Sequence, residues 1–339
     1  MKRSVRILTP LAFALAAMGA TASEAELSKR VAQQDGWVGW QVPVVETAGM
    51  ICCFDVRRHK GGVGNCDLDG HNVNIGLSDD DGPLPKADAM NVYLHTAHGQ
   101  IDKARVFSTS CKIRNTEQVR WLDQVAEADS VAFLAASAAN ATGEVADSEI
   151  MAVALHADAS ATAAMKQLAD ASRPRHLREQ ALFWLGQERG AEGAKFVEHV
   201  ATADGDAKMR EHAVFALSES HGIDAYASIH RISETDPSEQ VRAQALFWMA
   251  QMGDKRAKDD IFTAIRNEKS DKVSEQAVFA LSQLKDGEAE AALIDVVRGA
   301  YSRKAKEQAL FWLGQSGSAQ AMDFLDEVLS RSEPRTKVR

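Results

Sequence analysis

The pattern of apolar and polar residues repeats every 32 positions over the second half of the chain. The segment REQALFWLGQ at 178–187 returns as KEQALFWLGQ at 306–315. Its apolar residues have the three-to-four-residue spacing of an amphipathic helix, and the surrounding Ala, Leu, Glu, Gln and Lys favour helix. A fixed period of this length predicts a solenoid of stacked helical units. Five clear copies are headed by Gln180, His212, Gln244, Gln276 and Gln308.

A second helical stretch separates each copy from the next, so each unit is predicted to be a helical hairpin. Ser148 lies one period before Gln180, and residues 151–155 fit the pattern in a degraded form. A degraded first unit suits the end of a solenoid, because its outer face has no neighbour. We therefore expect about six units in residues 145–331. The second helices are expected at 160–172, 192–203, 224–235, 255–267, 287–298 and 318–330.

The first third of the chain has short β-branched and aromatic runs that Gly, Asn and Asp clusters separate, which is typical of strands and turns. The predicted fold class is α+β: a small β domain at 36–115, a helical connector at 116–144 and an all-α solenoid. The last two strands are predicted to form a hairpin. The strand candidates lie at 37–46, 50–56, 72–77, 90–97 and 101–111.

All four cysteines, Cys52, Cys53, Cys66 and Cys111, fall in this β domain. An even count favours two disulfides that staple a small domain. Neighbouring residues on a strand point to opposite faces, so Cys52 and Cys53 are expected to take different partners rather than each other. A redox or metal-binding role for the adjacent pair is the alternative.

The N-terminus has the features of a secretory signal peptide at 1–22: basic residues, an apolar stretch, and Ala20 and Ala22 before Ser23. Thr9 and Pro10 interrupt the apolar stretch, and no segment is apolar over the length of a membrane span. The sequence predicts an exported protein, periplasmic or secreted. The basic segment 332–339 lacks apolar periodicity and is predicted to be a disordered tail.

The formal charge of the chain is −9, and removing the signal peptide with its three basic residues takes it to −12. An acidic chain argues against nucleic acid as a partner, because phosphate binding needs clustered Lys and Arg.

The segment DPSEQVRAQALFWMA at 236–250 resembles the bacterial HEAT-like repeat of the phycobiliprotein-lyase type, whose second helix runs V-R-x-x-A-x-x-A-L-G. The units around Arg178 and Arg210 fit the same pattern. Ser274 and Lys306 depart from it at the arginine position, and Trp replaces the usual Ala in three units. The resemblance implies a HEAT-like α-solenoid.

Each repeat segment offers one phenylalanine between polar side chains. On a helix, Ala181 and Leu185 point toward the partner helix, while Gln180, Phe183 and Gln187 point roughly the opposite way, which is the concave face of a solenoid. We predict that this face binds a protein or an extended peptide. The alternative is that lateral packing between inner helices buries the rings. The predicted binding residues are Gln180, Phe183, Trp184, Gln187, Phe215, Gln244, Phe247, Trp248, Gln251, Gln276, Phe279, Gln283, Gln308, Phe311, Trp312 and Gln315.

The position after each phenylalanine alternates between Trp and Ala, so this feature has twice the period of the helical pattern. We expect each Trp to pack against the small residue of an adjacent unit, with its indole N–H bonded to a partner such as a glutamine. A row of indoles that binds a ligand directly is the alternative. The alternating positions are Ala152, Trp184, Ala216, Trp248, Ala280 and Trp312.

Motifs for catalysis are scarce: the chain has no G-x-S-x-G, H-E-x-x-H, P-loop or G-x-G-x-x-G. His95 and His98 have ligand-like spacing, but in a strand and turn this favours a surface role. We therefore expect a non-enzymatic binding scaffold without metal or cofactor. The lyase-type resemblance implies an enzymatic alternative, and thiol chemistry at the N-terminal cysteines is another. A third alternative places the ligand site on the β domain.

Overall fold

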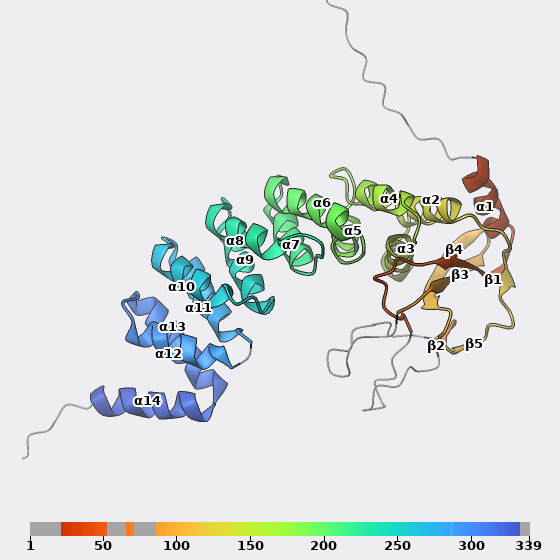
Figure 1. Ribbon diagram of the computed structural model, residues 1–339. Helices are drawn as coiled ribbons and strands as arrows, with labels where there is room; N and C mark the ends of the chain where they lie inside the picture. Colours follow the sequence, from red (N-terminus) through yellow and green to blue (C-terminus); the bar gives the residue numbers. More distant parts are fainter. Residues whose placement is uncertain (1–21, 53–65, 71–85, 286, 333–339) are drawn as a thin grey trace, which may run out of the picture.

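The computed structural model describes residues 22–52, 66–70, 86–285 and 287–332. A small region of strands lies at one end, and stacked helices extend from it in a curved solenoid (Figure 1). The predicted α+β fold class is confirmed. The predicted signal peptide lies almost wholly outside the described residues, and so does all of the predicted tail except Ser332.

The main sheet has the strand order β4-β3-β1-β6. Strands β3 (Ala89–Ala97) and β4 (Gln100–Ser108) form the predicted hairpin, and β1 (Gly36–Pro43) pairs antiparallel with β3. The short strand β6 (Arg120–Trp121) joins the other edge of β1 in parallel. A separate parallel pair consists of β2 (Cys66–Asp67) and β5 (Ile113–Arg114).

Some predictions for the N-terminal region differ from the structure, and one lies outside the residues that it describes. The strand at 50–56 is absent over its described residues 50–52, because Ile51 bonds to the backbone and hydroxyl of Ser108 at the end of β4 instead of joining the sheet. The candidate at 72–77 lies outside the described residues. The connector is helical only in α2 (Glu127–Ala138), and the helix α1 (Ala22–Ala32) precedes the sheet unpredicted.

Cys52 forms a disulfide with Cys111 and not with its neighbour in sequence. Cys66 is disulfide-bonded as well. Cys53 lies outside the described residues. The expectation that Cys52 takes a partner other than Cys53 is therefore confirmed.

Six helical hairpins follow, and their first helices begin at 143, 175, 207, 239, 271 and 303, evenly spaced by the period of the sequence pattern. Each first helix packs on the first helix of the next unit. The hairpins are α3 (Gly143–Leu155) with α4 (Ser160–Leu168), α5 (Arg175–Glu188) with α6 (Gly190–Ala203), α7 (Ala207–Ser218) with α8 (Ala225–Thr235), α9 (Glu239–Gln251) with α10 (Ala257–Asn267), α11 (Asp271–Ser282) with α12 (Glu288–Arg298), and α13 (Arg303–Ser316) with α14 (Ala319–Ser332). Figure 1 shows α4, α6, α8 and α10 along the convex edge and α5, α7, α9 and α11 along the concave edge.

The sheet and the first unit share one hydrophobic core, because β4 and α2 pack against α3. The outer face of the first unit therefore has a neighbour, contrary to the expectation from its degraded sequence.

A buried chain of hydrogen bonds crosses the joint between the sheet and the first unit. Nδ1 of His156 lies 2.6 Å from the carbonyl oxygen of Ala152, and because a carbonyl only accepts, Nδ1 carries the proton. Nε2 then accepts from the hydroxyl of Ser130 at 2.8 Å, and that hydroxyl accepts from Nε1 of Trp40 at 2.8 Å.

Gly186 and Gly314 occupy the same position in near-identical segments but have different surroundings. A Cβ at Gly186 would lie 2.5 Å from the carbonyl oxygen of Ala216 and 2.6 Å from Oγ of Ser220, whereas one at Gly314 meets nothing within 4 Å. We expect Gly186→Ala to lower the free energy of unfolding by about 1–3 kcal/mol through overpacking. Gly314→Ala should raise it by about 0.5–1 kcal/mol through helix propensity. Urea unfolding of both variants checks this, and equal effects would contradict it.

Candidate functional site

Eight aromatic rings form a continuous row along the five inner helices α5, α7, α9, α11 and α13. We call this row the aromatic array. Successive ring centroids lie 4.9–5.9 Å apart, within the range at which aromatic pairs attract each other. The sequence predicted a ladder of phenylalanines along the inner face with tryptophans packed between units, and the structure brings all eight rings into one row. In spatial order they are Trp184, Phe183, Phe215, Trp248, Phe247, Phe279, Trp312 and Phe311.

The alternation of Trp and Ala explains how the array crosses from unit to unit. Phe183 stacks on Phe215, with ring planes 16° apart, where the later unit has an alanine in the Trp position. The same arrangement recurs two units later, where Phe247 stacks on Phe279 with ring planes 7° apart. At the intervening junctions a tryptophan fills the gap: Trp248 lies 4.9 Å from Phe215, and Trp312 lies equally close to Phe279. Each of these two tryptophans thus packs on the preceding unit, where its ring contact is with a phenylalanine.

The indole N–H groups do not behave as predicted. Nε1 of Trp248 and of Trp312 are buried and have no hydrogen-bond partner within the protein. The expected glutamine partner is therefore wrong for these two indoles, because each ring is wedged between phenylalanine rings instead. A recess of about 230 Å³ beside Trp312 is lined by Ser282, Gln283 and Gln315. Its lining places the small residue Ser282 next to the tryptophan of the following unit.

The phenylalanines of the array are partly covered by their neighbours and partly open. Phe183, Phe215, Phe247 and Phe279 are half-buried, whereas Phe311 in the last unit is 53% exposed. The flanking glutamines remain accessible: Gln276 and Gln315 are exposed, and the rest are partly so. Lateral packing and an accessible surface therefore coexist at these positions. The remaining predicted glutamines are Gln180, Gln187, Gln244, Gln251, Gln283 and Gln308.

Three acidic residues that stand four positions before a phenylalanine of the array are paired with cations. Lys208 Nζ lies 2.9 Å from a carboxylate oxygen of Glu211, and Lys304 Nζ lies 3.8 Å from one of Glu275. Arg303 pairs in the same way with Glu307 at 3.5 Å. The surface thus combines half-open apolar rings with neutral amides and compensated charges. Chemically it can make apolar contacts and donate and accept hydrogen bonds.

A chain of arginines and acids, which we call the arginine chain, runs along the same units and was missed in the sequence. Each arginine pairs with an acid 26 positions later, and the pairs are Arg178 with Asp204, Arg210 with Asp236 and Arg242 with Glu268. Arg210 also donates to the backbone carbonyl of Asp204, and Arg242 to that of Asp236, so each arginine joins two units.

Arg210 shows the geometry of these pairs most completely. Its Nε and Nη2 donate to the two carboxylate oxygens of Asp236 at 2.8 and 2.9 Å, and both side chains are buried. The hydrogen bonds to Asp236 raise the pKa of Arg210. Burial opposes ionisation of Asp204, yet the hydrogen bond from Arg178 leaves the pKa of this acid below its ordinary value.

The last two units lack both the arginine and the acid. Ser274 stands at the arginine position with Ala300 at the position of the acid, and Lys306 is followed at the same distance by Ser332. This joint loss at fixed spacing is the sequence signal that would have revealed the pairs.

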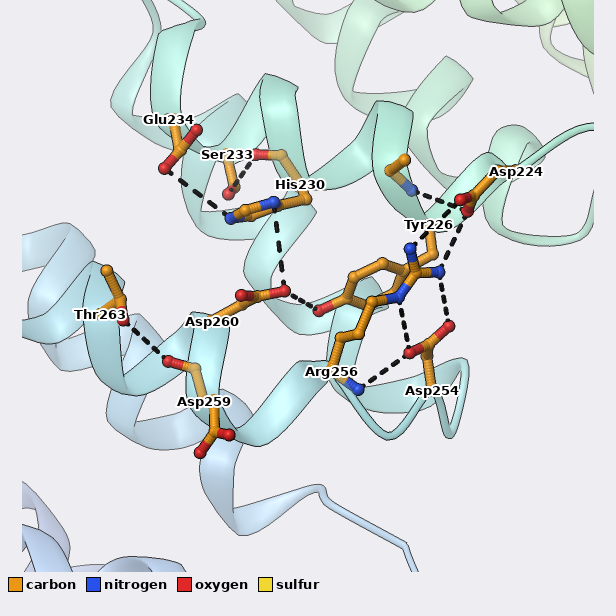
Figure 2. Close-up of polar contacts among 11 residues, drawn as sticks. Asp224, Tyr226, His230, Ser233, Glu234, Asp254, Arg256, Asp259, Asp260 and Thr263 are labelled. Carbon is orange, nitrogen blue, oxygen red and sulfur yellow. Dashed lines mark hydrogen bonds and ion pairs between the residues drawn. The ribbon is translucent and has the colours of Figure 1, made fainter.

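A polar cluster on the convex side joins α8 to α10 (Figure 2). Arg256 bonds to Asp224 and Asp254 and lies 4.3 Å over the ring of Tyr226. The hydroxyl of Tyr226 donates to Asp260 at 2.8 Å. Burial, together with this carboxylate, raises the pKa of Tyr226, so the phenol stays protonated. With its cation compensated and its phenol neutral, the cluster fastens two units together and presents no activated nucleophile.

A recess of about 370 Å³ lies next to this cluster and is lined by His230, which Figure 2 shows beside Asp260.

The β region has a recess of about 530 Å³ that the sequence did not reveal. Gln41, Asn91, Asp123 and the 45% exposed Trp121 are among its lining residues. Nδ2 of Asn91 donates to the hydroxyl of Tyr93, while its Oδ1 is buried without a partner in the protein. This is where a ligand site on the β region, the third alternative above, has structural room.

The other candidate groups of the β region are engaged in local contacts. No cysteine among the described residues is free. Nδ1 of His95 lies 2.6 Å from a carboxylate oxygen of Asp102, and its ring packs against Trp37. In the part of the chain that the structure describes, no three His, Cys, Asp or Glu side chains gather as metal ligands would.

Stacked helical hairpins define a helical-repeat scaffold, and comparison with known proteins refines this. Residues 229–300, from within α8 through α12, match the family model for HEAT repeats. The match and the stacked hairpins support a HEAT-repeat protein. No curated protein matches the chain.

One solved structure that is similar to the chain is human deoxyhypusine hydroxylase in complex with glycerol. It is 13% identical over 55% of this chain and 84% of that chain, with a TM-score of 0.30. At this level the likeness carries no argument about activity. None of the described helices is long and apolar enough to cross a membrane.

Proposed function

We propose that the protein is a non-enzymatic scaffold that binds an extended peptide segment of another protein along the aromatic array. The observation that carries the proposal is the continuous row of half-open rings between glutamines on the concave side. Rings supply apolar contact area, and primary amides both donate and accept hydrogen bonds. A peptide backbone offers alternating donors and acceptors of the same kind.

The spacing of the units suits an extended chain. Packed inner helices lie about 8–10 Å apart, and an extended chain advances about 3.3 Å per residue. Each unit therefore spans about three peptide residues, and five units span about fifteen. The compensated acidic residues on this face favour a segment of low net charge.

Export belongs to the same proposal. The N-terminal sequence supports it, and the Cys52–Cys111 disulfide is in keeping with an oxidising compartment. We expect the protein isolated from its source to begin near Ser23, which N-terminal sequencing of the mature protein checks.

Photo-crosslinking tests the binding face. Gln244 and Gln276 on the concave side are replaced, one at a time, by p-benzoylphenylalanine, and the full chain is irradiated with a library of unstructured peptides of about fifteen residues. We expect crosslinks at both positions. Asp259 on the convex helix α10 is exposed and serves as the matched control. A yield at Asp259 equal to that at the glutamines would contradict the proposal.

Loss of the amides should weaken binding without disturbing the rings. The triple variant Gln180→Ala, Gln244→Ala and Gln276→Ala removes three hydrogen-bonding groups, each worth about 0.5–1.5 kcal/mol. We expect at least tenfold weaker binding of a peptide recovered by crosslinking, with unchanged circular dichroism. An unchanged Kd would show that the peptide binds elsewhere.

A further inference from the structure

The last unit of the solenoid ends in an open apolar surface. Among the described residues, four large hydrophobic side chains are exposed, and three of them belong to this unit: Phe311 on α13, and Met322 and Leu329 on α14. We call this surface, together with Gly314, the end face. A solenoid end normally carries a polar outer side, so an apolar one indicates an interaction surface.

The end face is the same surface that earlier units use for stacking. Nine of ten residues are identical between REQALFWLGQ in α5 and KEQALFWLGQ in α13. In α5, Phe183 stacks on Phe215 at 5.7 Å, and Gly186 lets the backbone of α7 approach. Phe311 is exposed at the equivalent place, and Gly314 has nothing near it. The last unit thus presents a stacking surface that has no neighbour within the described chain.

The outer helix points its apolar residues in the same direction. Asp326 and Leu329 are equivalent, two repeat periods on, to Phe262 and Ile265 of α10, which are buried. Phe262 stacks at 6.0 Å on Tyr301, which lies beyond it along the solenoid. Met322 lies one turn before Asp326 on the same stripe. The stripe on α14 therefore faces the place where another unit would stack.

We propose that a second copy of this chain covers the end face, forming a two-fold symmetric dimer. The end face is self-complementary: when two α13 helices cross antiparallel at Phe311, the two rings stack as Phe183 and Phe215 do. Glu307 and Gln315 lie four residues to either side of Phe311, so each glutamate meets a glutamine rather than a like charge.

The dimer joins the two aromatic arrays end to end at Phe311, so the partner copy completes the last ring contact of each array. This inference stands independently of peptide binding. One charged side chain, Asp326, lies between Met322 and Leu329 on the stripe and approaches its symmetry mate. The two-fold arrangement therefore predicts that substitutions at Phe311 and at Asp326 change the dimerisation affinity in opposite directions.

Sedimentation velocity of the full-length mature protein tests the proposal. We expect a dimer at micromolar concentration, at least tenfold weaker dimerisation for Phe311→Glu, and tighter dimerisation for Asp326→Ala. Both side chains are exposed, so the variants fold as the parent does, which circular dichroism verifies. Trp121→Glu, at an exposed aromatic of the opposite end, is the control and should leave the dimer unchanged.

A parent protein that remains monomeric up to on the order of 100 µM overturns the proposal. So does a dimer that Trp121→Glu dissociates and Phe311→Glu does not. The proposal is also overturned if the protein is a monomer and its end face binds another protein. None of these results bears on peptide crosslinking at Gln244 and Gln276, so the two proposals fail separately.

Discussion

Replacing Arg210 by methionine should lower the free energy of unfolding by about 3–5 kcal/mol, because the buried carboxylate of Asp236 loses its counter-charge and both of its strong hydrogen bonds. The Asp204 carbonyl loses a donor as well. Urea unfolding at pH 7, followed by circular dichroism, measures the effect. Arg242→Met is the matched comparison, since its partner Glu268 is less deeply buried, and we expect a smaller loss.

Removing both partners distinguishes the stability that the ion pair contributes from the cost of leaving one buried charge without a partner. The double variant Arg210→Met, Asp236→Leu leaves no charge uncompensated, and we expect it to recover most of the stability that Arg210→Met loses. If the single variant cost less than about 1 kcal/mol, as exposed pairs do, the arginine chain would contribute little to stability.

The arginine chain should also make the solenoid sensitive to acid. The pKa of Glu268 lies below its ordinary value, because hydrogen bonds from the Ser270 backbone and Arg242 outweigh the effect of burial. An acid whose folded-state pKa is lowered contributes stability above its unfolded pKa, and this contribution is lost as pH falls through the folded pKa. The pKa of Asp204 is also lowered, so this acid too contributes stability that is lost as pH falls.

Most of the solenoid is predictable because its contacts are local. The fixed period of the sequence places the six first helices, whose hydrophobic faces meet partners one unit away. The joint to the β region was not predictable, since it depends on contacts such as Trp40 with Ser130, which are 90 residues apart and carry no repeat signal. The covered outer face of the first unit follows from the same long-range packing.

Part of the proposed binding surface was likewise predictable from the sequence, and part was not. Helical geometry identifies Phe183 and its flanking glutamines as one face of a helix. The continuity of the array depends on how far each unit is rotated against the next, and a single helical pattern does not contain this angle. The stacked and wedged ring pairs, and the indoles of Trp248 and Trp312 without partners, are consequences of that rotation. The arginine chain differs, since the fixed spacing between each arginine and its acid was readable in the sequence.

Glu149→Gln should raise the free energy of unfolding at pH 7 by about 2–3 kcal/mol. Glu149 lies in α3 at 1% exposure, where its Oε1 accepts from the hydroxyl of Ser137 at 2.7 Å and its Oε2 has no partner in the protein. Burial raises the pKa of this carboxyl to about 8. The folded protein must therefore hold a proton at pH 7 that the unfolded chain has released, and glutamine removes this cost.

The sign of the pH dependence separates this explanation from a simple packing change. The folded state binds the proton of Glu149 between its unfolded pKa of 4.5 and about 8, so the contribution of this group to stability falls as pH rises through this interval, by about 1.4 kcal/mol per unit. Denaturant unfolding of both proteins from pH 4 to 8 should give curves that meet near pH 4.5 and diverge above it. Parallel curves would mean that Glu149 is ionised when folded.

The loss of stability at low pH provides an internal control, because ionisable groups other than Glu149 cause it. Burial lowers the pKa of His156 to about 4, so the folded joint keeps this imidazole neutral while the unfolded chain takes up a proton below about 6.5. A group with a lowered pKa stabilises above that range, and its contribution is lost as pH falls. Glu149→Gln leaves His156 in place, and Glu149 is protonated in both states below about pH 4.5, so the loss of stability below that pH should be the same in parent and variant. A variant that also reduced this loss of stability at low pH would show that the substitution had opened the joint rather than removed one ionisation.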